Sequence, residues 1–573
     1  MNRVLSLAGL LAACLSVPLE AVKAGEAFCT PGELRTDSTP MCISIEWDLT
    51  GDTDHDATCG VRFREEGTAE WKDALPLFRV DYQWWYNTEK ADKPFNMFAG
   101  SIMFLKPGSK YEVSLDMADP DGGTATQTVS VATRPVPEPP KGGRTFHVVP
   151  GAGGGAGSAE APFPGLTAAQ DAAEPGDILL LHKGDYGSFN FEKSGTAGQY
   201  LVCKAAGDGD VVFTSVRINA SHLWLEGLTL KRQDEPDGLR AQGQATDVVI
   251  CRNTFTGFHY SITLSTESRN WCITDNVIVG DNDPNQPTTQ GGISGEGVEL
   301  NHSGGHVVAC NSISRVADGV SYPERNVDIY GNDIFDVSDD GLEPDRGYAN
   351  VRMWGNRITN AKNNALSFQP MRCGPWYFVR NLVIGQGAIF KFRVQDRFVL
   401  VNNTFVRWGA TGSRMHHILS SLSRNNLYIS AGGEEPIWIG GDCTQPQFCL
   451  PNNYEPTWMT DVDYDGFDWG DYREGFRWNN RRRRFTDVEE FAAAVGIERH
   501  GIRVRKEDTF DNWSIPAEPA RVPPQHLPLT AAGTAVDAGA VVPNLSENFK
   551  GKAPDLGAYE FGDVMPDFGP RKK

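Results

Sequence analysis

The densest group of ionisable side chains lies in residues 339–346, which read Asp-Asp-Gly-Leu-Glu-Pro-Asp-Arg. Four carboxylates, those of Asp339, Asp340, Glu343 and Asp345, fall within seven residues. Carboxylates this close repel one another unless they are protonated or share a cation, so the segment predicts raised pKa values or a Ca²⁺ site at Asp339 and Asp340. The alternative interpretation is an acidic turn with a solvated face.

A pattern of four residues recurs around this segment. An acidic or amide residue, a small residue, an apolar residue and a polar residue follow one another at 296–299, 318–321, 340–343 and 364–367. If each apolar residue points into a core, the residue after it faces outward, because side chains alternate along a strand. One exposed column then contains Glu299, Ser321, Glu343 and Ser367.

Polar residues continue on the same predicted face. In the next strand, the alternation buries Phe390 and Phe392 and exposes Lys391 and Arg393. Stacked parallel strands are about 4.8 Å apart, so two coils would separate Glu343 from its partners by about 9.6 Å, the width of a sugar site in a groove. The other polar residues expected on this face are Asn301, Asp345, Gln369 and Arg372, and Pro344 and Arg346 interrupt the strand.

An internal repeat indicates the architecture that positions this column. Asn, a variable residue and an apolar residue recur eight times, and consecutive Asn residues are separated by 23, 35, 21, 24, 25, 22 and 22 residues. One coil of a parallel β-helix has about this length, and the interval of 35 indicates a loop insertion at 281–296. Asn suits a left-handed bend and can form amide ladders along a stack. The residues expected to stack are Asn253, Asn276, Asn311, Asn332, Asn356, Asn381, Asn403 and Asn425.

The two ends of this region point to a family. Residues 146–151 (Phe-His-Val-Val-Pro-Gly), a helix-like stretch at 166–173 and residues 175–181 (Pro-Gly-Asp-Ile-Leu-Leu-Leu) resemble the capped start of a β-helix of the pectate-lyase-like superfamily. Residues 535–539 and 553–560 resemble the closing segment common in bacterial β-helix proteins. We therefore expect a right-handed parallel β-helix at 144–442.

The resemblance implies a polysaccharide substrate but leaves the reaction open. In a lyase, Lys391, Arg393 or Arg346 would be the base, and the acidic segment would hold Ca²⁺. In a hydrolase, Glu299 and Glu343 would be the acid and base, and a separation of about 6.5–9.5 Å predicts inversion. Arg346, Gln369 and Arg372 would bind the substrate.

The double Asp at 339–340 resembles that of polygalacturonases, but no Gly-His-Gly or Arg-Ile-Lys occurs in suitable coils. We rank a uronate-specific polysaccharide lyase first, an inverting glycoside hydrolase second and an epimerase third. From a different class, a non-catalytic cell-surface protein for glycan binding or adhesion stays open. Loss of turnover without loss of fold on neutralising Glu343 separates an enzyme from a binding protein.

The segments outside the repeat predict further units. Residues 105–113 (Leu-Lys-Pro-Gly-Ser-Lys-Tyr-Glu-Val) and Trp47 resemble the core of a fibronectin type III-like β-sandwich, which we expect at 29–134. A proline-rich linker follows at 135–143. Beyond the β-helix we expect an irregular excursion at 443–520, with a short helix capped by Thr486 and Gly496, and a closing segment and tail at 521–573.

Composition and the first residues indicate an exported protein. The chain has 573 residues and a net charge of -21, which disfavours nucleic acid as a partner. Residues 1–24 read as a signal peptide, which predicts a periplasmic, extracellular or outer-membrane protein. Residues 11–14 resemble a lipobox, which would anchor the chain to a membrane through a lipid on Cys14. We expect a monomer.

Overall fold

The computed structural model describes residues 27–81, 95–285, 294–368, 373–392, 395–409, 418–419, 421–433, 436–440, 461–478 and 483–572. The predicted signal peptide and Cys14 lie outside these residues. No helix among them is long and apolar enough to span a membrane. The eight cysteines that the structure describes are all free.

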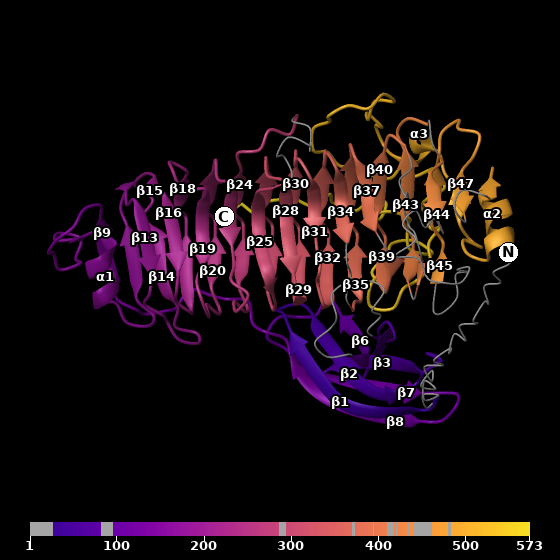
Figure 1. The fold of residues 1–573 in the computed structure, drawn as a ribbon, viewed down its shortest axis with the longest axis horizontal. Helices are drawn as coiled ribbons and strands as arrows, with labels where there is room; N and C mark the ends of the chain where they lie inside the picture. The colour runs from indigo at the N-terminus through magenta and orange to yellow at the C-terminus, as the bar shows by residue number, and fades with distance from the viewer. Residues whose placement is uncertain are drawn as a thin grey trace, which may run out of the picture.

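Most of the chain winds into a right-handed parallel β-helix, as the repeat predicts, with three long parallel sheets that run along its axis (Figure 1). Each coil contributes one short strand per sheet, and the strands pair with those of the next coil in parallel register. Apolar side chains of all three sheets fill the interior. The all-β fold class is therefore confirmed.

The sheets differ in length among the described residues, with 14, 13 and nine strands. The 14-stranded sheet contains, in spatial order, β10 (Phe163–Pro164), β9 (Thr145–Val149), β11 (Ile178–Leu181), β14 (Leu201–Ala205), β17 (Leu223–Glu226), β20 (Val249–Cys251), β23 (Cys272–Thr274), β26 (Val307–Ala309), β29 (Arg325–Tyr330), β32 (Ala349–Trp354), β35 (Trp376–Val379), β39 (Phe398–Val401), β42 (Leu422–Arg424) and β45 (Asp461–Asp463). The 13-stranded sheet contains β12 (Gly184–Asp185), β15 (Val211–Phe213), β18 (Thr229–Lys231), β21 (Thr254–Thr256), β24 (Val277–Val279), β27 (Ser312–Ser314), β30 (Asp333–Phe335), β33 (Arg357–Thr359), β36 (Leu382–Gly385), β40 (Thr404–Arg407), β43 (Leu427–Ser430), β46 (Gly466–Asp468) and β49 (Ile502–Arg503). The nine-stranded sheet contains β13 (Ser188–Phe191), β16 (Ser215–Ile218), β19 (Asp237–Ala241), β22 (Tyr260–Thr263), β25 (Glu296–Ser303), β28 (Asp318–Pro323), β31 (Asp340–Glu343), β34 (Asn364–Phe368) and β37 (Ala388–Phe392).

A buried ladder of asparagines joins successive coils. The side-chain amide of each Asn donates to the side-chain oxygen of the next; Asn332 Nδ2 to Asn356 Oδ1, for example, is 3.0 Å. The residue before each Asn has a positive φ, so the left-handed bend lies there and not at the Asn itself. The prediction was therefore wrong at one end, because Asn425 forms the bend and Asn426 the ladder.

The β-helix continues past its predicted end at residue 442. Strands β45 and β46 add another coil, and β49 extends the 13-stranded sheet to Arg503. Asp465 ends the ladder by accepting from Asn426 Nδ2 at 3.0 Å. Part of the predicted excursion is thus regular solenoid. The smaller sheets in this region contain β38 (Gln395–Asp396) with β41 (Ile418–Leu419), and β44 (Trp438–Gly440) with β47 (Phe476–Trp478) and β48 (Arg483–Phe485).

Three short helices accompany the strands. Helix α1 (Leu166–Ala172) covers the open end of the solenoid, as predicted (Figure 1). Helix α2 (Val488–Val495) ends at Gly496 as predicted, but its N-cap is Asp487, one residue after the predicted Thr486. Helix α3 (Lys506–Thr509) follows β49.

The C-terminal segment runs back along the side of the solenoid (Figure 1). Its apolar residues pack on the outer face of the 13-stranded sheet, where Leu556 and Tyr559 join Leu427 and Ile429. Arg571 reaches Asp275, with Nη2 donating to Oδ2 at 2.6 Å. The predicted closing segment therefore covers a side of the described β-helix and adds no strand to its end.

The N-terminal region contains two antiparallel sheets that face each other across one apolar core. Trp47 is fully buried in that core, as the resemblance implies. The assignment to the fibronectin type III class, and the domain boundaries, stay predictions. One sheet contains β1 (Cys29–Ser38), β2 (Ile43–Gly51), β6 (Asn96–Ile102) and β5 (Phe78–Asp81), and the other contains β4 (Lys72–Asp73), β3 (Thr58–Glu65), β7 (Lys110–Ala118) and β8 (Thr124–Ala132).

This sandwich packs directly on the 14-stranded sheet. Arg352, fully buried in the solenoid, donates to Asp328 Oδ1 at 2.6 Å and to the hydroxyls of Ser44 and Ser101 in the sandwich. An apolar cluster crosses the same interface. The linker at 135–141 lines a cavity of about 580 Å³ against the solenoid. No pattern in the sequence predicted this contact.

Candidate active site

Acidic residues from three successive coils meet on the nine-stranded sheet. One oxygen from each of Glu296, Asp318 and Glu343 lies within 4.8 Å of the others, and the same holds for Asp318, Asp339 and Asp340. The two groups share Asp318 and therefore form one set across β25, β28 and β31, with Asp339 directly before β31. We call these five residues the solenoid acidic cluster.

A glycine in each coil explains how residues three apart can face the same side. A Cβ atom on Gly341 would lie 2.7 Å from Cγ2 of Ile358, a residue of the solenoid core. The glycine and Leu342 therefore both face the interior, so Asp340 before them and Glu343 after them both face outward. The same contact recurs in the two preceding coils, where Gly297 meets Ile313 and Gly319 meets Ile334.

Sequence reasoning missed Glu296 and Asp318 for this reason. Strict alternation from Val298 and Val320 turns both acidic residues inward. The signal that could have found them is the recurring triplet of acidic residue, glycine and apolar residue. A side chain at the middle position would clash with the core, so the glycine marks a local break in the alternation.

Burial makes the negative charge of the cluster costly. Glu343 is 8% exposed, and its burial, followed by the charges of Asp345 and Asp340, raises its pKa to about 9. Burial also raises the pKa of Glu296 to about 8 and that of Asp318 well above its usual range. The carboxylates would therefore hold protons near neutral pH unless a cation replaces them.

The donor set fits a hard divalent cation. Glu296 Oε2 and Glu343 Oε2 are buried and accept no hydrogen bond from any described residue. A buried carboxylate oxygen without a partner is costly, and here two such oxygens belong to one cluster. Because all five ligands would be carboxylate oxygens, Ca²⁺ matches the site better than a metal that prefers nitrogen or sulfur.

Hydrogen bonds from the next coil orient two of these carboxylates. Asn364 Nδ2 donates to Asp340 Oδ1, and Asn363 Nδ2 donates to Asp339 Oδ1, both at 2.6 Å. The backbone amide of Asp340 donates to Asp318 Oδ1 at 2.8 Å. The cluster is therefore held on rigid strands rather than on a free loop.

Among the lysines that the structure describes, Lys391 forms an ion pair with the cluster. Its Nζ lies 3.1 Å from Asp340 Oδ2, and its side chain is 27% exposed. Strand register places it in the predicted column, opposite Ser367. Burial acts to lower the pKa of Lys391, but Asp340 and Asp345 together outweigh it and hold the pKa above its usual range.

The remaining predicted residues are distributed around this centre. Asp345 is buried and accepts from Ser367 Oγ at 2.8 Å. Arg346 is exposed in the turn after β31. Glu299 lies opposite Ser321, which lies opposite Glu343, as the predicted register requires. The prediction that this column is exposed was wrong, because Ser321, Glu343 and Ser367 are buried. Burial raises the pKa of Glu299, and Thr263 and Arg240 act to lower it. Gln369, Arg372 and Arg393 lie outside the described residues.

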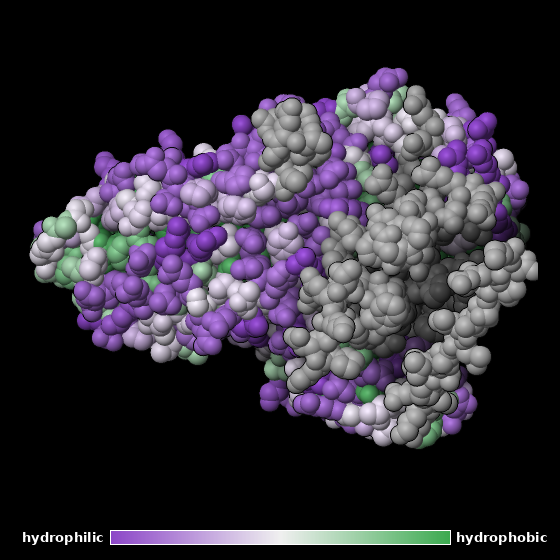
Figure 2. Space-filling view, in the orientation of Figure 1, coloured by the Kyte–Doolittle hydropathy of each residue, from purple (hydrophilic) through white to green (hydrophobic). Residues whose placement is uncertain are grey.

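Tyr322 is a further residue that the sequence did not reveal. It lies at the end of β28, and its ring centroid is 5.2 Å from that of His302. Burial, followed by the negative charges of Glu343 and Glu296, raises the pKa of its phenol. A tyrosine thus lies beside the acidic cluster. The visible face of the solenoid is mostly hydrophilic around β25 and β28 (Figure 2).

Similarity to known proteins is limited to solved structures. No family model and no curated protein matches the chain. Among solved structures, the chain is similar to the crystal structure of pectate lyase Pel9A, with 16% sequence identity and a TM-score of 0.42. The match covers 74% of this chain and 98% of that one.

Proposed function

We propose that the chain is a polysaccharide lyase that cleaves a uronate-containing polymer by β-elimination on the nine-stranded sheet. The observation that carries this proposal is the contact between a buried acidic cluster and one lysine, at 3.1 Å from Lys391 Nζ to Asp340 Oδ2. Elimination from a uronate needs a base for the C5 proton and positive charge near the sugar carboxylate. Lys391 would be the base, and a cation held by the cluster would supply the positive charge.

Lys391 is the base in this proposal. It accepts the proton from C5, the electron pair forms a C4–C5 double bond, and the C4–O bond breaks. The oxygen of the leaving sugar takes a proton from water. The side chain of Lys391 is 27% exposed, which would let a sugar bound on the sheet approach it.

The solenoid acidic cluster would hold the Ca²⁺ ion, with Glu296, Asp318, Asp339, Asp340 and Glu343 as ligands. When bound, Ca²⁺ supplies positive charge that binds the sugar carboxylate and makes the C5 proton more acidic. The negative charges of Asp340, Asp345 and Asp339 keep the pKa of Lys391 above its usual range, against the effect of burial. With the charge of the cluster neutralised, Asp345 would be the main carboxylate still favouring the charged form of Lys391, and burial would oppose it.

Two further residues complete the proposed site. The exposed guanidinium of Arg346 would bind a substrate carboxylate, because Arg forms bidentate pairs with planar anions. Gln369 and Arg372, which lie outside the described residues, stay candidates for substrate binding, and Arg393 stays an alternative base. Export, lipidation of Cys14 and a monomeric state also stay predictions.

An inverting hydrolase is the second candidate. The column Glu299, Ser321, Glu343 places the two glutamates two coils apart, which is about 9.6 Å. The raised pKa of Glu343, at about 9, would suit a general acid. The lyase is favoured because the cause of that shift, after burial, is the neighbouring carboxylates, which a cation would neutralise.

A panel of polysaccharides tests the proposal. The mature protein is incubated with uronate-containing and neutral polymers, with Ca²⁺ or with a chelator, and both ultraviolet absorbance and reducing ends are followed. A lyase gives unsaturated, absorbing products from uronates only, and the chelator stops it reversibly. Reducing ends without absorbance would support the hydrolase, and binding without any product would support a non-catalytic glycan-binding protein.

A further inference from the structure

A second acidic cluster lies at one end of the N-terminal sandwich, away from the residues proposed for catalysis. One oxygen from each of Asp52, Asp56 and Asp119 lies within 4.8 Å of the others, and so do oxygens of Asp54, Asp56 and Asp121. Asp56 belongs to both groups, so the five residues form one set. We call it the sandwich acidic cluster.

The strand pairing explains why these residues meet. Asp52, Asp54 and Asp56 follow β2 in the loop before β3, and Asp119 and Asp121 follow β7 in the turn before β8. Because β3 and β7 pair antiparallel with Thr58 opposite Ala118, the loop and the turn lie side by side. The five carboxylates therefore come from two segments of chain that are far apart in sequence.

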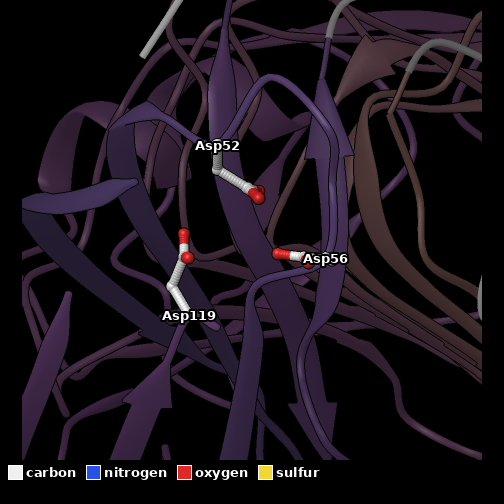
Figure 3. A group of neighbouring side chains, drawn as sticks. All are labelled: Asp52, Asp56 and Asp119. Atoms are coloured by element: carbon white, nitrogen blue, oxygen red, sulfur yellow. The ribbon is translucent and has the colours of Figure 1, made fainter. Parts of the chain in front are cut away.

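Asp119 gives independent reason to expect a ligand. The residue is 7% exposed, and its Oδ1 accepts from the backbone amide of Asp121 at 2.8 Å. Its Oδ2 is buried and accepts no hydrogen bond from any residue that the structure describes. Figure 3 shows the Asp119 carboxylate directed toward the space between Asp52 and Asp56. A buried carboxylate oxygen in that position lacks a positive partner.

The charge balance of the cluster is incomplete. Asp52 pairs with the buried Arg79 and also accepts from the amide of Ala57 at 3.1 Å. In the described part of the chain, no lysine or arginine forms an ion pair with Asp54, Asp56, Asp119 or Asp121. Five carboxylates therefore share one guanidinium.

The carboxylates of the cluster are close enough to repel one another. Although Asp56 is exposed, partial loss of hydration, followed by the charges of Asp54 and Asp119, raises its pKa. A hydrogen bond with Asp54, and then the charge of Asp54, raises the pKa of Asp121. A shared proton relieves one such contact, whereas a divalent cation would relieve all of them.

We propose that the sandwich acidic cluster binds a calcium ion, with Asp54, Asp56, Asp119 and Asp121 as ligands and Asp52, fixed by Arg79, at the base of the site. All donors are carboxylate oxygens, and no described histidine or cysteine joins them, which favours Ca²⁺ over Zn²⁺. The aspartates alternate as Asp-Thr-Asp-His-Asp at 52–56, so one loop offers three oxygens at short spacing.

The ion would fasten the β2–β3 loop to the β7–β8 turn where the described chain begins. The amide of Asp52 donates to the carbonyl of Phe28, and the amide of Cys29 donates to the carbonyl of Gly122. Both segments of the cluster thus already contact the start of β1. Calcium would order this end of the sandwich, and this role is independent of the reaction on the solenoid.

Hydrogen exchange of the full mature chain, with and without Ca²⁺, tests the proposal with local resolution. We expect Ca²⁺ to slow exchange about tenfold or more at residues 52–57 and 119–123, since these amides open with the loops. Unchanged exchange in both segments at millimolar Ca²⁺ would overturn the proposal. A response confined to the solenoid would overturn it too, while leaving the proposed function intact.

Variants separate ion binding from a general effect on folding. Asp119→Asn should abolish the slowing, and the exposed Asp56→Asn should weaken apparent Ca²⁺ affinity at these segments about tenfold or more without unfolding the sandwich. Asp116→Asn is the matched control, because Asp116 lies on β7 but pairs with Arg62. Full Ca²⁺ protection in the Asp56→Asn chain would contradict the assignment.

Discussion

Two regions of this molecule crowd carboxylates together, and they do so on different supports. The solenoid acidic cluster lies on stacked strands, next to Lys391. The sandwich acidic cluster lies on a loop and a turn, and its cation is Arg79, which is 3% exposed and committed to Asp52. Both arrangements fit Ca²⁺, but only the first offers a partly exposed base within reach. Crowded carboxylates thus indicate a cation, and the nearby base decides whether chemistry can follow.

The largest expected effect comes from removing that base. Lys391→Met keeps the length of the side chain but cannot accept a proton, so we expect lyase activity to fall about 10³-fold while the fold persists. Initial rates of unsaturated product measure this. Lys231→Met, at an exposed position on the 13-stranded sheet, is the control. In the sandwich, Asp56→Asn should leave the rate unchanged. Equal losses in all three variants would remove the distinction between the clusters.

A smaller loss is expected when one ligand of the solenoid acidic cluster is neutralised. Glu343→Gln keeps the shape of the side chain, and we expect activity to fall about 100-fold and to need more Ca²⁺. The matched variant is Glu299→Gln, in the same column but outside the cluster. The lyase predicts a loss below about tenfold there, whereas a hydrolase predicts comparable losses in both. Full activity of Glu343→Gln would move the chemistry elsewhere.

The pH dependence of stability should report on the solenoid acidic cluster with a smaller effect. The native pKa of Glu343 is raised from 4.5 to about 9, and that of Glu296 from 4.5 to about 8. Between pH 4.5 and these raised values, the native state therefore binds more protons than the unfolded state. In a chelator, the free energy of unfolding should therefore fall as the pH rises through this window.

Added Ca²⁺ should cancel this fall, so its stabilising effect should grow with pH. We expect the gap in Tm between Ca²⁺ and chelator to widen by about 2 °C or more from pH 5 to pH 9. Scanning calorimetry measures both curves. In Glu296→Gln/Glu343→Gln the widening should shrink. A gap that narrows with rising pH would contradict the assigned direction.

The smallest effect concerns the frame that supports the solenoid acidic cluster. Gly341→Ala places a Cβ 2.7 Å from the carbonyl oxygen of Ala365 and from Ile358 Cγ2, so we expect a loss of about 1–3 kcal/mol in the free energy of unfolding. Ala365→Gly, in the same pattern one coil later, should cost about 1 kcal/mol or less. Urea unfolding compares them. Equal losses of stability in the two variants would mean that the glycine is not what turns two successive residues toward the interior.

Much of the architecture could be predicted because it depends on local spacing. Consecutive Asn residues recur at one coil length, and a buried amide ladder is a physical reason for that spacing. The end of the ladder was misplaced by one residue because Asn425 and Asn426 are the same residue type. The last coil escaped prediction because 39 residues separate Asn426 from Asp465, which hides the repeat.

The site was predictable only in part, because it depends on a break in the strand pattern. Glu343 and Lys391 follow from alternation, and Asp340 from the density of carboxylates at 339–345. Glu296 and Asp318 do not, since the glycine after each turns two successive residues inward. The contact between sandwich and solenoid could not be predicted either, because Arg352 donates hydrogen bonds to Ser44 and Ser101, which lie hundreds of residues earlier in the chain.

Cleavage of a uronate polymer in ¹⁸O-labelled water, with Ca²⁺ present and products weighed by mass spectrometry, tests the central claim most directly. The account predicts products that carry a double bond and no label, and no product from Lys391→Met. Products that gain one labelled oxygen, at a rate unaffected by Lys391→Met, would contradict it and establish hydrolysis.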